Sequence, residues 1–202
     1  GAIEVLAKPN GPYSVTDLRV ILPQKIRSAA KARLRVRQEA PRPPVVARVT
    51  PAVVDSSRCV IAIGASTGGT EAIRAVLEQL PQNMPPIVIV QHIPPVFSRA
   101  FADRLDKTCK MQVKEAADGD RVLPGVALIA PGDYHMLLRG RAGSYSVELK
   151  TGPRVCYQRP SVDVLFQSVA DAGSATVAVL LTGMGSDGAQ GMLAIRQRGG
   201  RT

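Results

Sequence analysis

Three short loops of the sequence carry side chains that together could perform nucleophilic catalysis. Each loop follows an apolar run, and the loops supply a hydroxyl at Ser66, an imidazole at His92 and a carboxylate at Asp187. A serine attacks a carbonyl carbon when a base removes its proton, and a third group commonly orients that base. Because the carboxyl ends of parallel strands meet at one edge of a sheet, we expect the three side chains to converge there. The pattern therefore predicts a nucleophile, a general base and an orienting carboxylate.

The loop around Ser66 permits three interpretations when it is taken by itself. Residues 64–68 read GASTG and match G-x-S-x-G, in which small neighbours let a serine occupy a tight strand-to-helix turn. The same loop could hold a phosphate at a helix N-terminus, or it could be an ordinary glycine-rich turn. The nucleotide-binding signatures are incomplete, since Thr70 rather than lysine follows Gly69. Gln91 and His92 also stand where a dinucleotide-binding fold has an acidic residue for the ribose.

Other residues compete for the roles of base and carboxylate. His135 is the second of the two histidines, and we interpret it as structural because it begins a predicted hairpin. Asp133 and Asp163 compete with Asp187, but Asp163 lies near a predicted helix start, where the helix dipole accounts for an acid. Asp187 is favoured because its loop, 182–188, holds three glycines, which let the backbone approach another group closely.

The segments around these loops predict an α/β fold. Their apolar runs show no alternation, which is typical of parallel strands covered on both faces. The strands are expected at 60–63, 87–90, 126–130 and 176–181, the helices at 70–80, 98–107, 162–170 and 189–198, and an antiparallel hairpin at 135–139 and 145–149. The expected architecture is a doubly wound, mainly parallel sheet with flanking helices and a hairpin, which is a Rossmann-like three-layer arrangement.

The first 58 residues differ in charge from the rest of the chain. They carry 11 Lys and Arg against 4 Asp and Glu, a net of +7, whereas residues 59–202 carry 15 against 12, a net of +3. The excess is densest in the Pro- and Arg-rich stretch 25–48. Tyr13 is the only aromatic residue before Phe97, so the stacking side chains typical of a nucleic-acid reader are missing. We therefore interpret 33–56 as a solvated basic linker.

Composition also excludes several classes of protein. Hydrophobic residues make up 45% and charged residues 21% of the 202 residues, as in globular chains. The apolar runs are too short for a membrane span of about 20 residues, and no secretory signal is visible. The three cysteines are widely spaced, which argues against a disulfide framework or a zinc site and favours a reducing cytoplasm. We expect Cys59, Cys109 and Cys156 to be buried or incidental thiols.

Six segments resemble the chemotaxis receptor methylesterases of the CheB type, which are protein-glutamate methylesterases and glutamine deamidases. They are IGASTGGTEA (63–72), QHIP (91–94), VKEAADGDRVLPG (113–125), IAPGDYHM (129–136), RPSVDVLF (159–166) and LTGMGSDGAQGM (181–192), in the family's order. The resemblance implies a serine hydrolase that releases methanol from glutamate methyl esters, or ammonia from glutamines, on bacterial chemoreceptors during adaptation in chemotaxis. Its catalytic residues would be Ser66, His92 and Asp187, with oxyanion donors in the backbone N–H groups of Thr67 and Met184, and it needs no metal or organic cofactor.

The resemblance also implies a domain organisation. Lys8-Pro9 and residues 14–30 resemble the end of a response-regulator receiver domain, so 1–32 is expected to be its C-terminal remnant. Residues 57–202 would be the methylesterase catalytic domain, truncated at its C-terminus. The implied partners are the cytoplasmic domains of methyl-accepting chemoreceptors and, through the receiver, a chemotaxis histidine kinase. Nucleic acid and membrane insertion are not expected, and the location would be cytoplasmic.

Three alternatives remain open. The chain could be a methylesterase of a chemotaxis-like pathway with another output. It could be a phosphate- or nucleotide-binding module that uses the loop 64–69. It could also be a basic interaction protein that acts through 25–48.

Overall fold

The computed structural model describes residues 14–31 and 59–202. Lys8-Pro9 and the linker expected at 33–56 lie outside these ranges. The first described part is the helix α1 (Ser14–Lys31), which spans the residues 14–30 that resemble the end of a receiver domain and continues through Pro23. Contacts within the chain divide it into two compact units, Gly1–Thr50 and Pro51–Thr202.

Five parallel strands form the central sheet of the second unit. They are β1 (Val60–Ala65), β2 (Ile87–Gln91), β3 (Gln112–Glu115), β4 (Val126–Ile129) and β7 (Thr176–Leu180). The spatial order is β3-β4-β2-β1-β7, and every neighbouring pair is parallel. The carboxyl ends of β2, β1 and β7 therefore lie side by side, and the predicted parallel sheet is confirmed.

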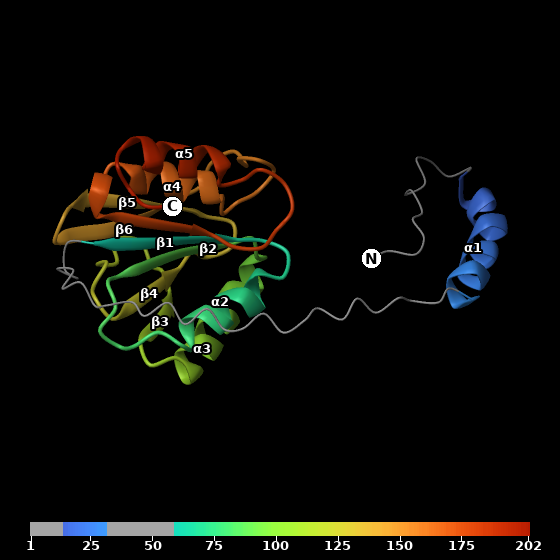
Figure 1. The fold of residues 1–202 in the computed structure, drawn as a ribbon, viewed down its shortest axis with the longest axis horizontal. Helices are drawn as coiled ribbons and strands as arrows, with labels where there is room; N and C mark the ends of the chain where they lie inside the picture. The colour runs from blue at the N-terminus through green and yellow to red at the C-terminus, as the bar shows by residue number, and fades with distance from the viewer. Residues whose placement is uncertain (1–13, 32–58) are drawn as a thin grey trace. The chain divides into compact units, whose positions relative to one another are not determined.

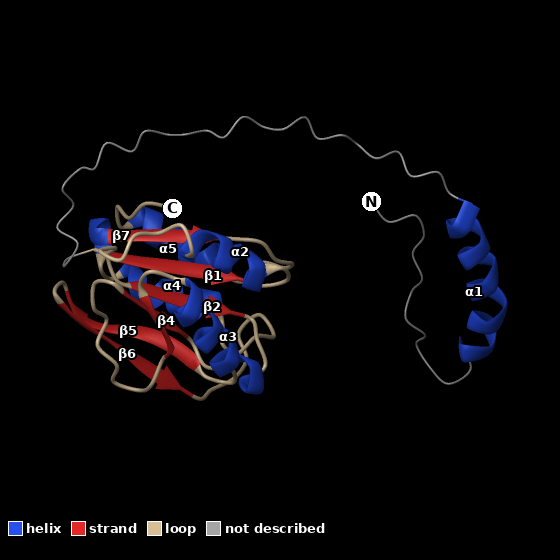
Figure 2. Ribbon diagram, turned by 90° about the horizontal axis from the view of Figure 1, so that it is seen from below, coloured by secondary structure: helices blue, strands red, loops and turns tan. Residues whose placement is uncertain are grey.

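Helices cover both faces of this sheet (Figure 1). One face packs against α2 (Gly69–Leu77) and α3 (Pro95–Thr108). The other packs against α4 (Val162–Ala170), α5 (Ala189–Gln197) and the hairpin of β5 (His135–Arg141) and β6 (Ser144–Lys150). The hairpin is a separate antiparallel two-stranded sheet (Figure 2).

Strand β1 shows why the apolar runs do not alternate with polar residues. Val60 and Ala62 belong to the core cluster under α4 and α5, while Ile61 and Ile63 contribute to the cluster under α2 and α3. Side chains of a strand point alternately to its two faces, so a strand buried on both faces needs apolar residues throughout. Burial of each large aliphatic side chain stabilises the fold by about 1.5–3 kcal/mol.

Two local predictions differ from the structure. The strand β3 was not expected, because its sequence QVKE is mostly polar and only Val113 is buried. β3 lies at an edge of the sheet, where a strand can remain short and partly polar. The helix expected from residue 98 begins at Pro95, because proline is well suited to the first turn of a helix.

Within the described ranges, no helix is both long enough and apolar enough to cross a membrane.

Candidate active site

The three side chains predicted from the loops lie in one hydrogen-bonded chain. Ser66 follows β1, His92 follows β2, and Asp187 lies in the loop after β7. The Ser66 Oγ atom lies 2.9 Å from His92 Nδ1, and His92 Nε2 lies 2.7 Å from Asp187 Oδ2. Because the carboxylate accepts a hydrogen bond from Nε2, the ring proton is on Nε2. The lone pair of Nδ1 then faces the serine hydroxyl. The imidazole is thus placed to accept the serine proton.

The turn that carries Ser66 is fixed by backbone hydrogen bonds to two segments. The Ser66 N–H donates to the carbonyl of Thr182 at 2.9 Å, and the Ser66 carbonyl accepts from Gly69 N–H at 2.8 Å. Gly68 caps α2 with a φ of 76°, a conformation that glycine adopts without strain. A Cβ on Gly183 would lie 2.6 Å from Ser66 Cβ. The predicted close approach of the glycine-rich loop 182–188 is therefore made to the serine itself.

The Asp187 carboxylate accepts four hydrogen bonds at the N-terminus of α4. Its Oδ1 accepts from Ser161 Oγ at 2.7 Å and from Asp163 N–H at 2.9 Å. Its Oδ2 accepts from Val162 N–H at 2.8 Å in addition to His92. The exposed N–H groups and the dipole of a helix N-terminus both favour an anion at this position.

Two opposing effects act on the ionisation of this carboxyl. Burial alone would raise the pKa of Asp187, whose side chain is 4% exposed. The hydrogen bonds from His92, from the N–H groups of Asp163 and Val162 and from the Ser161 hydroxyl outweigh burial and hold the pKa below its usual value. The group is therefore a carboxylate at neutral pH and is able to stabilise an imidazolium.

Ser161 is a supporting residue that the sequence reasoning missed. Its side chain is fully buried and caps α4 by accepting from Val164 N–H, while its hydroxyl donates to Asp187. A serine directly before a helical segment is a recognisable cap signal. Its link to Asp187 depends on how α4 packs against the loop 182–188, and no local pattern contains that information.

Gln91 is a second supporting residue. Its side chain is 4% exposed, and its Nε2 donates to the carbonyls of Ser66 at 2.8 Å and His92 at 3.1 Å. One amide group therefore joins the backbone of the predicted nucleophile to that of the predicted base. Its Oε1 has no hydrogen-bond partner among the described residues. The available sequence signal was a polar residue at the end of an otherwise apolar strand.

His135, which competes with His92 for the role of base, has other hydrogen-bond partners. The Nε2 atom of His135 lies 3.0 Å from the Pro153 carbonyl, and its Nδ1 accepts from Ser161 N–H at 3.2 Å. This histidine is 5% exposed, and both ring nitrogens are engaged with backbone groups. These contacts favour the structural interpretation of His135.

The competing carboxylates are likewise engaged away from the histidine base. Asp133 forms a salt bridge to Arg159 at 2.6 Å. Asp163 is 4% exposed and accepts from Gly191 N–H at 2.8 Å, which joins α4 to α5. The choice of Asp187 over these two acids agrees with the geometry.

The predicted oxyanion donors are Thr67, which follows the serine in sequence, and Met184, which lies in the loop after β7. Met184 is 82% exposed and lines a cavity of about 70 Å³ together with Ser66, His92 and Asp187. The carbonyl of Thr67 accepts from Thr182 Oγ1 at 3.1 Å. Within 59–202, the N–H groups of Thr67 and Met184 have no backbone acceptor. This lack of a backbone acceptor is compatible with the predicted role of both groups.

One cluster in the described ranges has metal-binding residue types. Oxygen or sulfur atoms of Cys156, Asp163 and Asp187 lie within 4.8 Å of one another. The Asp187 carboxylate already accepts four hydrogen bonds, which fill its lone-pair positions, and Asp163 is bonded to Gly191 N–H. The donor set therefore does not fit a metal ion.

Comparison with known proteins identifies the family of this chain. A family model described as CheB methylesterase matches residues 61–202. The protein-glutamate methylesterase/protein-glutamine glutaminase 2 of Syntrophus aciditrophicus (strain SB) is 50% identical over 205 residues, which cover 100% of this chain and 60% of the relative. The protein-glutamate methylesterase/protein-glutamine glutaminase of Shigella flexneri is 50% identical over 208 residues, which cover 100% of this chain and 58% of the relative. The chain thus spans about 60% of the length of the curated relatives that it matches.

A solved structure gives the same assignment. The crystal structure of the Thermotoga maritima CheB methylesterase catalytic domain superposes with a TM-score of 0.69 and 42% sequence identity, covering 71% of this chain and 77% of that one. This likeness supports the Rossmann-like α/β assignment. The chain belongs to the CheB methylesterase family.

Proposed function

We propose that this chain is a serine esterase that hydrolyses glutamate γ-methyl esters, and deamidates glutamines, in a protein substrate. The observation that carries the proposal is the hydrogen-bonded chain from Ser66 Oγ through His92 to Asp187. The names of the curated relatives, protein-glutamate methylesterase/protein-glutamine glutaminase, support the choice of substrate.

The acylation step uses this chain of groups in order. His92 Nδ1 takes the proton of Ser66 Oγ as the oxygen attacks the γ-carbonyl carbon of the ester. Asp187 keeps the proton on Nε2 and stabilises the imidazolium that forms. The carbonyl oxygen becomes an oxyanion and accepts from the N–H groups of Thr67 and Met184, each of which contributes about 3 kcal/mol.

Collapse of this intermediate breaks the ester bond. The methoxide takes the proton from His92 and leaves as methanol, and an acyl-enzyme remains on Ser66. Water then gives a proton to His92, attacks the acyl carbon, and releases the glutamate carboxyl and the free serine. The sum is ester plus water giving acid plus methanol, and a glutamine in place of the ester releases ammonia.

The wider organisation follows from the same proposal. We place a receiver remnant at 1–32, a basic linker at 33–56 and the methylesterase domain at 57–202. The protein substrate is a chemoreceptor whose methylated glutamates lie in its cytoplasmic part, and the receiver connects the enzyme to a histidine kinase. The helix α1 at Ser14–Lys31 is consistent with the last helix of such a receiver.

Methanol release tests the proposal. The chain and its Ser66→Ala variant are incubated with receptor carrying radiolabelled methyl esters, and Ser144→Ala, at an exposed serine of the hairpin, is the matched control. We expect Ser66→Ala to lower the rate at least about 10³-fold and the control to leave it unchanged. Equal rates for wild type and Ser66→Ala would refute the proposal.

A further inference from the structure

Three hollows of the second unit share wall residues with one another. The first is the cavity around Ser66 and His92. The second, of about 270 Å³, has His92 and Ile93 in its wall, and the third, of about 280 Å³, has Ile93 and Phe97. His92 is shared by the first two and Ile93 by the second two, so the three hollows adjoin. We call the second and third together the His92–Ile93 groove.

Exposed apolar side chains lie in the wall of this groove or next to its wall residues in sequence. Phe97 is 59% exposed in its wall, and Val96 beside it is 81% exposed. Tyr157, in the loop that lines the second hollow, is 90% exposed. Single exposed apolar residues are ordinary, but several of them near hollows beside a reactive centre are typical of a binding surface. The groove is therefore suited to a macromolecular substrate that extends beyond the reacting group.

The second hollow also carries one positive charge that the fold does not neutralise. Its walls contain Arg154, Arg159 and Asp133. Arg159 is engaged by Asp133 at 2.6 Å and by the Gly152 carbonyl, so these two charges compensate each other. No carboxylate in the described part of the chain forms a salt bridge with Arg154, which is exposed. An exposed guanidinium without a salt-bridge partner is suited to bind a carboxylate of another molecule.

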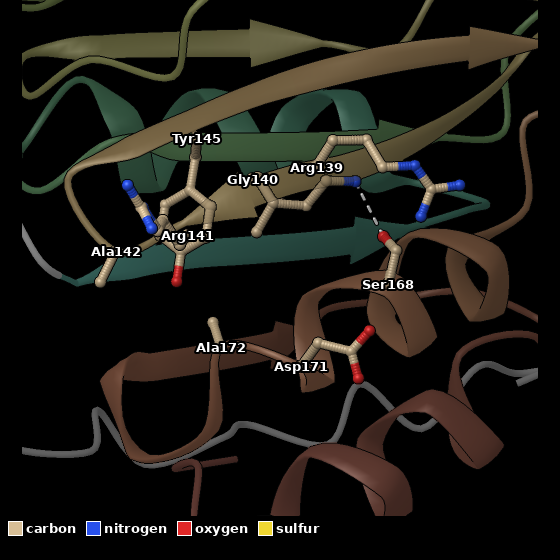
Figure 3. Close-up of a pocket in the computed structure, with 9 residues that line it drawn as sticks. Arg139, Gly140, Arg141, Ala142, Tyr145, Ser168, Asp171 and Ala172 are labelled. Atoms are coloured by element: carbon tan, nitrogen blue, oxygen red, sulfur yellow. Dashed lines mark hydrogen bonds between the residues drawn. The ribbon is translucent and has the colours of Figure 1, made fainter.

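Another hollow does not belong to this surface. It measures about 400 Å³ and lies between the hairpin residues Arg139, Arg141 and Tyr145 and the C-terminal end of α4 (Figure 3). Asp187 is held at the opposite end of α4, and a nine-residue helix is about 14 Å long. Arg141 is therefore an exposed arginine beside a hollow that is remote from Ser66, and it serves as a matched control for Arg154.

We propose that the His92–Ile93 groove binds a segment of the protein substrate that carries apolar side chains and unmodified glutamates, with Arg154 pairing with a glutamate near the ester. The inference rests on the proposed function, since it concerns the same active site. Each hydrolysis converts a neutral ester into a carboxylate. A neighbouring site that has lost its methyl group thus becomes a ligand for Arg154, and demethylation at one glutamate promotes binding for the next.

Two synthetic peptides test this pairing. One carries a γ-methyl glutamate ester flanked by glutamates, and the other has serines at the flanking positions. We expect the wild-type chain to hydrolyse the glutamate peptide with a kcat/KM about fivefold higher than that for the serine peptide. The difference should arise from a lower KM for the glutamate peptide, and added salt should reduce it. Arg154→Glu should reverse this preference, whereas Arg141→Glu should keep it. Both variants should hydrolyse p-nitrophenyl acetate, which is too small to reach the groove, at the wild-type rate.

The outcomes separate the two proposals. Equal kcat/KM for both peptides with the wild-type chain, or an unchanged preference in Arg154→Glu, would overturn the groove assignment and leave the esterase intact. Equal loss of activity on both peptides in Arg154→Glu, with an unchanged rate on p-nitrophenyl acetate, would also overturn it, because Arg154 would then not distinguish the flanking charges. Undiminished methanol release by Ser66→Ala would instead refute the esterase and the groove assignment with it.

Discussion

Replacement of Asp187 by asparagine keeps the shape of the side chain but changes its hydrogen-bonding capacity. In the structure all four neighbours of the carboxylate are donors: Ser161 Oγ and Asp163 N–H at one oxygen, and His92 Nε2 and Val162 N–H at the other. An asparagine must place an NH₂ group at one of the two oxygen positions. In either orientation this group faces a backbone N–H that cannot become an acceptor.

The magnitude follows from these contacts. A buried N–H without an acceptor costs about 1–3 kcal/mol, and hydrogen bonds to a charged acceptor contribute about 1.5–3 kcal/mol each. We therefore expect the free energy of unfolding of Asp187→Asn to fall by about 3 kcal/mol at neutral pH. If the NH₂ group faces His92, Nε2 must accept and the ring proton moves to Nδ1. The base then cannot take the proton of Ser66, and kcat should fall by about 10⁴.

The dependence on pH has a definite sign. The pKa of Asp187 is lowered in the folded state, so its carboxylate contributes stability above its unfolded pKa. This contribution is lost as the pH falls through the lower folded pKa. Asparagine does not titrate, so the difference in stability between wild type and Asp187→Asn should narrow below about pH 4.

The assays are ester hydrolysis and urea denaturation at several pH values. Asp171→Asn is the matched control, because the Asp171 side chain is 75% exposed and pairs with Arg198 at the surface. We expect its kcat to equal that of wild type and its stability to change by less than about 1 kcal/mol. A kcat of Asp187→Asn within tenfold of wild type, with unchanged stability, would refute the reasoning.

Three further substitutions address the groups around the reactive serine. Ser161→Ala should lower the free energy of unfolding by about 1–2 kcal/mol, measured by urea denaturation, and should lower kcat about tenfold, measured by steady-state kinetics. A kcat equal to that of wild type would show that the Ser161 hydroxyl is only a helix cap. Gln91→Leu removes both donors to the loop carbonyls and should lower kcat about tenfold with an unchanged circular dichroism spectrum; full activity would show that the carbonyls stay aligned without it. Gly183→Ala should lower kcat about 100-fold, since the new Cβ would lie 2.6 Å from Ser66 Cβ. Gly152→Ala, whose Cβ would meet only His135 at 4.0 Å, should remain fully active, and equal effects at both glycines would contradict the close approach.

The buried strands could be predicted from sequence because both of their faces contact the core. Four apolar runs located β1, β2, β4 and β7 to within one or two residues. β3 was missed because an edge strand needs few apolar side chains, and its neighbour β4 supplies its hydrogen bonds. Its position is determined by pairing between segments, which a local pattern does not record.

The same distinction applies to the candidate site. We could predict the grouping of Ser66, His92 and Asp187 because each follows the carboxyl end of a parallel strand, where catalytic and binding residues commonly lie. Ser161 and Gln91 could not be predicted, because their partners lie 26 and 25 residues away in sequence and belong to other elements. The assignment of oxyanion donors to Thr67 and Met184 stays a prediction, since a backbone N–H carries no residue-specific signal.

The separation of His92 and Asp187 by 95 residues has a consequence for the growing polypeptide. A chain that emerges from the ribosome exposes the serine and the imidazole long before β7 and the loop after it have been translated. The carboxylate can take its place only after β7 has paired with β1 and α4 has docked beside it. Such long-range contacts form late in folding, because closing a long loop carries an entropic cost. On the proposed mechanism, ester cleavage therefore cannot begin until β7 and the loop that carries Asp187 have been made and have packed against β1 and α4.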